Sequence, residues 1–117
     1  MEVAQNSRRT TCQKDSTRHR RRLDMVFLIA YKIASSKNDY TSLHERIKSL
    51  GNWFHYLDSF WLLEPTSLNN AREIHDHLVP FIYGADNDYI IVMRATKSDY
   101  YGWLPSTAWQ WIQSREF

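Results

Sequence analysis

One apolar run, residues 25–31 (MVFLIAY), limits what this chain can fold into more than any other feature. The run has the length of a strand and lacks alternating polar positions, so we expect a central strand that is buried on both faces. It is far too short to cross a bilayer as a helix, and no small-residue cleavage pattern follows it. The run therefore predicts a strand-containing core without a membrane segment or a secretory leader.

Helical and strand patterns alternate after this run. Asp39 is suited to cap a helix that we expect Gly51 to end, because apolar residues recur between them at helical spacing. The aromatic-rich segment that follows is broken at Asp58-Ser59, which predicts a hairpin with strands at 53–57 and 60–64.

The second half of the chain repeats this alternation. Ser67 or Thr66 is expected to cap a second helix, a fourth strand is expected at 89–95, and Pro105 suits the first turn of a last helix. The predicted fold class is therefore α+β, a ferredoxin-like βαββαβ sandwich with an extra C-terminal helix. Apolar residues on both sides of the strand at 60–64 predict a partner on the open sheet face, for which a symmetric homodimer is the natural solution.

The first 24 residues differ in composition from the rest. They hold seven Lys and Arg against three Asp and Glu, whereas residues 25–117 hold eight against ten. We therefore divide the chain into a disordered basic tail, 1–24, and a ferredoxin-like domain, 25–117. The tail is interpreted as a solvated leader or, if Met25 is the true start, as no part of the protein. A nucleic-acid-binding arm is the alternative. Its candidate residues are Arg18, Arg20, Arg21 and Arg22.

Cysteine use excludes two classes of site. The chain has one cysteine, Cys12, so a disulfide framework and a cysteine-based metal cage within one chain are both excluded. This composition favours a reducing, cytoplasmic setting. We predict no resident metal or other cofactor.

Two residues of the predicted hairpin are weak catalytic candidates. His55 lies among aromatic residues and has the chemistry of a general base at neutral pH, although a packing role is favoured. Asp58 lies in the turn, at the same predicted rim as Asp86 and Asp88, where carboxylates suit Mg²⁺. Asp is also a common turn residue, and that interpretation is favoured here.

Two other patterns suggest binding sites but favour packing. His75 and His77 are two residues apart, so on a helix they do not face each other and are poorly placed to chelate one ion. The hairpin aromatics resemble a stacking platform for bases, but the chain has no Lys or Arg between Gly51 and Asn70. We therefore predict that the hairpin aromatics pack in a core or a dimer interface.

Residues 25–112 resemble a family of small bacterial proteins that genomes often label SinR-family. The family is similar to the ferredoxin-like proteins of CRISPR spacer adaptation and to virulence-associated protein D. The stretches that carry the resemblance are residues 25–31, Asp39-Tyr40, residues 53–61 (WFHYLDSFW) and Gly102-Trp103-Leu104.

The resemblance implies a homodimer and, in nuclease-like members, an Asp at the end of the first strand that helps to hold a divalent metal. This chain has Tyr31-Lys32 where those relatives have Tyr-Asp. A lysine brings positive charge to the place of a cation, so the protein is expected to be a non-catalytic dimeric module that binds a protein or a nucleic acid. The alternative is a divergent endonuclease that uses Mg²⁺, with His55 and Asp58 near the dimer seam.

Overall fold

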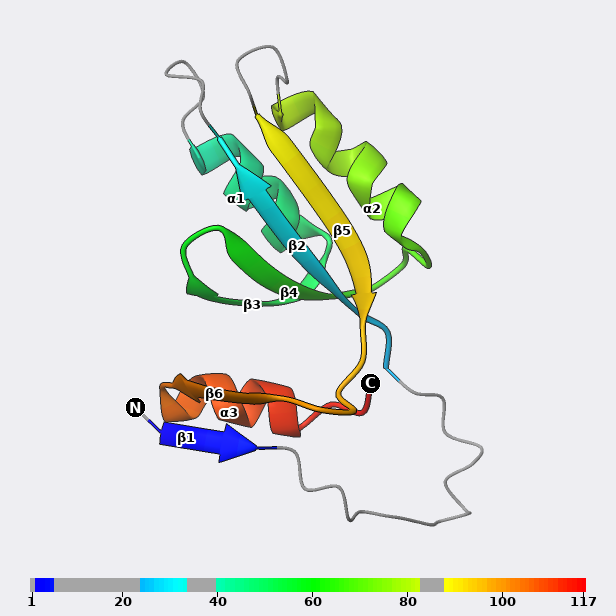
Figure 1. The fold of residues 1–117 in the computed structure, drawn as a ribbon. Helices are drawn as coiled ribbons and strands as arrows, with labels where there is room; N and C mark the ends of the chain where they lie inside the picture. Colours follow the sequence, from blue (N-terminus) through cyan, green and yellow to red (C-terminus); the bar gives the residue numbers. More distant parts are fainter. Residues whose placement is uncertain (1, 6–23, 34–39, 83–87) are drawn as a thin grey trace. The chain divides into compact units, whose positions relative to one another are not determined.

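Strand β2 (Val26–Lys32) lies in the middle of a four-stranded antiparallel sheet with the order β3-β4-β2-β5 (Figure 1). The computed structural model describes residues 2–5, 24–33, 40–82 and 88–117. These residues form two compact units, which we call the sheet unit (Met25–Ala95) and the terminal unit (Met1–Asp24 with Thr96–Phe117).

The sheet unit has the predicted succession of helices and strands. The remaining elements are α1 (Tyr40–Ser49), β3 (Gly51–Leu57), β4 (Phe60–Pro65), α2 (Ala71–Leu78), the short 3-10 helix η2 (Val79–Phe81) and β5 (Tyr89–Ala95). The α+β class is therefore confirmed, as are the central strand, the hairpin and the fourth strand.

Both helices of the sheet unit cover the same face of the sheet, because their apolar stripes need a partner. Phe27, Ile29 and Tyr31 alternate along β2 toward this face and join the core. The helices contribute residues at helical spacing, and β4 contributes two more. These residues are Leu43, Ile47 and Leu50 of the first helical segment, Ile74 and Leu78 of α2, and Trp61 and Leu63 of β4.

The expected cap of α2 is wrong, and Gly51 has a role besides marking the end of α1. Asn70 caps α2, because its side chain accepts a hydrogen bond from the Glu73 amide at 2.9 Å. Thr66 instead donates its amide to the Leu50 carbonyl at 3.0 Å. Helix α1 ends at Ser49, just before Gly51, and Gly51 itself begins β3, where a Cβ would collide with the Glu64 carbonyl. Close approach of two strands therefore explains this glycine.

The terminal unit contains two strands that the sequence analysis did not predict. Strand β1 (Glu2–Gln5) pairs antiparallel with β6 (Tyr101–Leu104), and α3 (Ser106–Gln113) follows (Figure 1). Residues 2–5 belong to the stretch that we assigned to a disordered tail. The last helix forms where it was expected, and it groups with β1 and β6.

Backbone bonds and one lysine close the terminal unit. Asp24 donates its amide to the Glu116 carbonyl at 2.8 Å, and the Glu116 amide donates to Asp24 Oδ2 at 3.0 Å. Lys97 Nζ donates to the Ile112 carbonyl at 2.9 Å and also to the Arg115 carbonyl, which satisfies the end of α3. Burial lowers the pKa of Lys97. None of the described helices is long and apolar enough to cross a membrane.

Candidate functional site

The hairpin brings His55 and Asp58 together, but the His55 side chain contacts the backbone carbonyl of Asp58 and not its carboxylate. His55 lies in an irregular stretch of β3 between Phe54 and Leu57, where pairing with β4 shifts register. Its ring stacks on Trp61, with ring centroids 3.8 Å apart and planes 7° apart. His55 Nε2 donates to the Asp58 carbonyl at 2.9 Å, and the Asp58 side chain is exposed.

A second histidine, which the sequence analysis did not single out, lies beside His55. The rings of His44 on α1 and His55 meet edge to face, with centroids 5.1 Å apart and planes 70° apart. His44 Nε2 lies 2.7 Å from the Tyr31 hydroxyl, which accepts a hydrogen bond from Trp61 Nε1 at 3.0 Å. We call Tyr31, Tyr40, His44, His55 and Trp61 the histidine cluster.

The partner of His55 determines which of its two nitrogens carries the proton. A carbonyl only accepts, so neutral His55 carries its proton on Nε2 and leaves Nδ1 as an acceptor. The Trp61 indole only donates, so the Tyr31 oxygen accepts from it, and the Tyr31 hydroxyl either donates to His44 Nε2 or accepts from it. The cluster thus places two imidazole rings side by side, and Nδ1 of neutral His55 is an acceptor.

Burial shifts the titration of two cluster members. The pKa of His44 is lowered, first because burial disfavours its charged form and second because His55 and Lys48 lie nearby and disfavour a further positive charge. The pKa of Tyr31 is raised, mainly because burial disfavours the phenolate. His44 therefore remains neutral at a pH where a solvent-exposed histidine begins to take up a proton.

The rim of the histidine cluster combines exposed aromatic rings with a cation. Tyr40 is 47% exposed and stacks on His44, and Trp53 is 41% exposed beside Trp61. Lys48 Nζ lies 5.0 Å from the centroid of the Trp53 ring. The hairpin has no basic residue of its own, but α1 provides one next to its aromatic residues. Only tertiary packing creates this combination.

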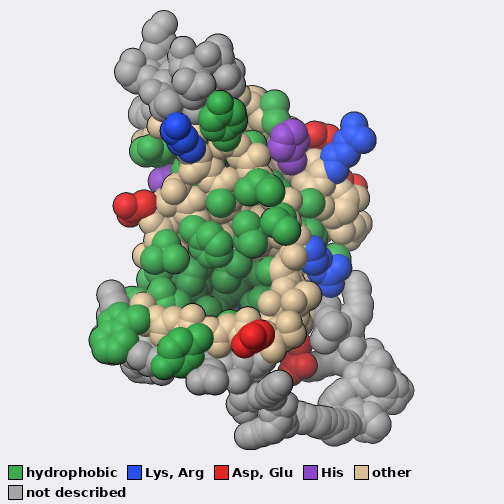
Figure 2. Space-filling model, viewed as in Figure 1, with side chains coloured by type: hydrophobic (Ala, Val, Ile, Leu, Met, Phe, Trp, Pro, Cys, Tyr) green, Lys and Arg blue, Asp and Glu red, His purple; other side chains and the backbone are tan. Residues whose placement is uncertain are grey.

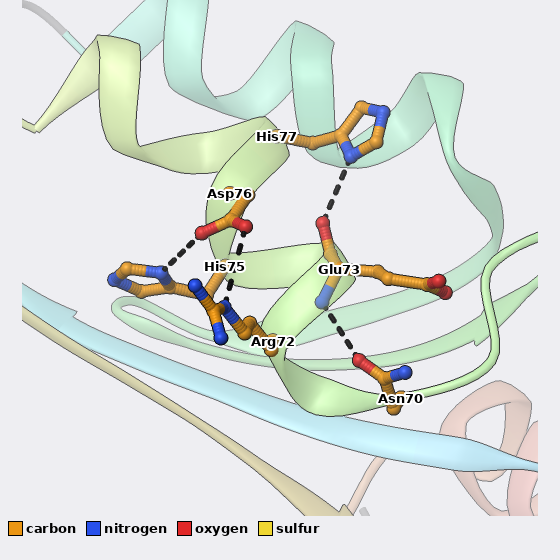
Figure 3. Close-up of polar contacts among 6 residues, drawn as sticks. All are labelled: Asn70, Arg72, Glu73, His75, Asp76 and His77. Carbon is orange, nitrogen blue, oxygen red and sulfur yellow. Dashed lines mark hydrogen bonds and ion pairs between the residues drawn. The ribbon is translucent and has the colours of Figure 1, made fainter.

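His75 and His77 project to different sides of α2 (Figure 3). His75 Nδ1 pairs with Asp76 at 3.2 Å, and His77 Nδ1 donates to the Glu73 carbonyl at 2.8 Å. Arg72 completes the exposed network by pairing with Asp76 at 3.8 Å. Each histidine therefore bonds to another residue of α2, and the two rings do not form a shared site.

The expected rim of three carboxylates is described only in part. Asp58 is exposed and Asp88 is buried, whereas Asp86 lies outside the described residues. Lys32 lies beside Tyr89 on the neighbouring strand, with Nζ 5.9 Å from the ring centroid. Within the described residues, no three His, Cys, Asp or Glu side chains are grouped to hold a metal ion.

The sheet face opposite the helices is apolar; it is buried at Val26, Phe54 and Leu62 and exposed along β5. Figure 2 shows hydrophobic side chains gathered over the sheet on this side. On β5, Tyr89, Ile91 and Met93 alternate toward it and are 60%, 52% and 50% exposed. We call this surface the open sheet face. Its other members are Leu28 and Ala30 of β2, Phe60 of β4 and Leu57 of β3.

The proposed nucleic-acid-binding arginines of the tail, Arg18, Arg20, Arg21 and Arg22, lie outside the described residues. Comparison with known proteins gives no relative to guide an assignment: no protein-family model, curated protein or solved structure matches the chain. The resemblance to the SinR-family proteins therefore stays a prediction, and function must be argued from the two surfaces above.

Proposed function

We propose that the protein is a ferredoxin-like binding module that works as a homodimer through its open sheet face. The βαββαβ succession and the sheet order β3-β4-β2-β5 support the fold assignment, with α3 as the additional helix. The observation that carries the functional proposal is the exposure of Tyr89, Ile91 and Met93 in one row.

A second copy of the chain suits this surface better than a nucleic acid does. By strand alternation, Glu64 of β4 and Lys32 of β2 also lie on this side of the sheet, and Lys32 lies against Tyr89. A symmetric dimer brings identical patches together, and the row of Tyr89, Ile91 and Met93 carries no charge that would repel its copy. Phosphate recognition instead needs several Lys or Arg side chains.

Solution mass tests this proposal. Light scattering after size-exclusion chromatography should give a dimer for the full-length chain and a monomer for Ile91→Lys, because the new charge would be buried in the interface. Val79→Lys is the matched control, since Val79 is an exposed apolar residue on η2 and should leave the dimer intact. A monomeric wild-type chain would reject the homodimer and direct the search to a different protein partner.

A second candidate function, nucleic-acid cleavage, is favoured by the histidine cluster. His44 and His55 place two imidazoles with ring centroids 5.1 Å apart, and a pair of histidines can supply a general acid and a general base. Lys48 and the exposed ring of Trp53 provide contacts for a phosphate and a base. The described residues support this acid–base form more than a magnesium-dependent form, for which Asp58 lacks grouped partners.

Cleavage assays separate the two functions. RNA and DNA substrates are incubated with purified protein, with Mg²⁺ or with a chelator, and compared with His44→Gln and His55→Gln. Activity that survives the chelator and is lost in both variants would support the acid–base form, whereas dependence on Mg²⁺ and Asp58 would support the metal form. His75→Gln should behave like wild type. If no substrate is cleaved, nucleic-acid cleavage is rejected and the proposal of a binding module remains.

A further inference from the structure

Two aromatic side chains of β6 lie largely in water. Tyr101 and Trp103 are 69% and 63% exposed, more than any other large hydrophobic side chain of the described residues. A Cβ on Gly102, between them, would lie 3.4 Å from the Trp109 ring of α3. Because neighbouring residues of a strand face opposite sides, α3 covers the Gly102 side and the two exposed rings share the other side of β6.

This arrangement suits the bases of an unpaired nucleic-acid strand. Residues two apart on a strand are separated by about 6.7 Å, so the two rings form a row in which each can take one base. Stacking needs only an accessible ring face, and it accepts any base because every base has such a face. In a duplex the bases are stacked on one another and do not offer their faces to a protein ring.

Positive charge is concentrated in the unit that carries this row. The terminal unit holds nine Lys and Arg against five Asp and Glu, a net +4, whereas the sheet unit holds six against eight, a net −2. Seven of the nine cations lie in residues 8–22, a stretch that begins three residues after Gln5, the residue that pairs with Tyr101. Such a surplus attracts a phosphate backbone without regard to its sequence.

The same charge disfavours a second copy of the chain as the occupant of this row. A symmetric contact would bring together two units of net +4, which repel each other. The hairpin aromatics differ in this respect, because they belong to the sheet unit with its net negative charge. Exposed rings and surplus positive charge therefore occur together only in the terminal unit.

We propose that Tyr101 and Trp103 form a stacking platform for single-stranded nucleic acid, and that the positive charge of the terminal unit attracts the phosphate backbone to it. The platform consists of the two rings, and the charge acts on the strand as a whole. The proposal concerns the terminal unit and does not depend on the homodimer or on the histidine cluster.

Binding of labelled oligonucleotides to the full-length chain tests the platform. Fluorescence anisotropy is measured over a salt series with single-stranded DNA and RNA of about 12 nucleotides. Tyr101→Ala and Trp103→Ala should each lower the affinity about tenfold, and the salt dependence should stay as in wild type because no charge is removed. Trp103→Phe keeps a ring and should retain most of the affinity. Tyr56→Ala, which removes an exposed tyrosine of β3, is the matched control and should bind like wild type.

The outcome separates the platform from attraction by charge alone. Salt-sensitive binding that is unchanged in both alanine variants would overturn the platform, because the basic stretch would then account for all of the affinity. Failure of the wild-type chain to bind any single strand would overturn it as well. If the alanine variants do not fold, the NMR signal of the Trp103 indole N–H in the wild-type protein decides. It should shift when the oligonucleotide is added, and a signal that stays fixed at saturation rejects the proposal.

Discussion

The two faces of the four-stranded sheet use similar side chains but differ in what covers them. On the helix side, Phe27, Ile29 and Trp61 are almost completely buried. On the opposite side, Val26, Phe54 and Leu62 are also buried, but Tyr89, Ile91 and Met93 of the edge strand β5 leave half or more of their surface in water. Apolar character in a strand therefore does not indicate which face is the core. The coverage by α1 and α2 does.

This contrast explains why the central strand reads as a continuous apolar run. A strand with one wet face normally alternates apolar and polar residues, whereas β2 is apolar on both sides. The second apolar set of β2 is buried at Val26 and half-buried at Leu28 and Ala30. The exposed row on the neighbouring strand β5 is the reason for proposing a second copy on the open sheet face.

The largest expected difference between the faces comes from truncating one isoleucine on each. Ile29→Ala should lower the free energy of unfolding by about 2–5 kcal/mol, because it leaves a cavity in the core. Ile91→Ala should lower it by less than about 1 kcal/mol under monomeric conditions, since Ile91 is half exposed. Urea unfolding of both variants at low protein concentration measures the comparison. Equal losses would contradict the assignment of the core.

A smaller effect is expected from removing the Tyr31 hydroxyl. Tyr31→Phe leaves Trp61 Nε1 and His44 Nε2 without their shared partner and should cost about 1–3 kcal/mol. Tyr40→Phe is the matched control in the same cluster, and it should stay within about 0.5 kcal/mol because that ring is half exposed. Thermal unfolding of the two variants measures the difference. A larger loss in the control would show that the network is not centred on Tyr31.

The raised pKa of Tyr31 predicts a further loss of stability in alkali. The folded state holds this proton above the ordinary value of 10.0, so the stabilisation is complete below that pH and decreases as the pH rises through the folded pKa. The effect should be smaller than that of deleting the hydroxyl, because solvent screens a partly buried group. Urea midpoints of wild type and Tyr31→Phe should therefore converge at high pH. Midpoints that stay equally far apart at high pH would contradict the raised pKa of Tyr31.

The smallest effect is expected on the open sheet face itself. Lys32→Ala removes a cation that lies over the Tyr89 ring, and under monomeric conditions it should change the unfolding free energy by at most about 0.5 kcal/mol. Urea unfolding at low protein concentration provides the measurement. A loss comparable to that of Ile29→Ala would mean that this face is part of the core after all.

Much of the sheet unit could be predicted from local patterns. The strand at β2, the hairpin and β5 follow from apolar runs and turn residues that are neighbours along the chain. The cap of α2 was less predictable, because Thr66 and Ser67 look as suitable as Asn70 until Thr66 is engaged by Leu50. Strands β1 and β6 pair across almost the whole chain, and neither short segment signals its partner.

The candidate site was predicted only at its hairpin end. His55 and Asp58 stand out because they are neighbours in an aromatic segment, and the structure joins them through the Asp58 carbonyl. His44 and Tyr31 carry no comparable local signal, since each is one residue of an ordinary helix or strand. Their roles depend on α1 placing His44 against β2 and β3.

The sequence by itself determined the α+β class, the central strand and the aromatic hairpin of this protein, because periodicity and turn chemistry act between residues that are close along the chain. Only the tertiary structure decided which sheet face is core and which histidines meet. Both depend on contacts between residues that are far apart in sequence. For such contacts, the packing of α1 and α2 on one face of the sheet sets the distance, the burial and therefore the chemistry.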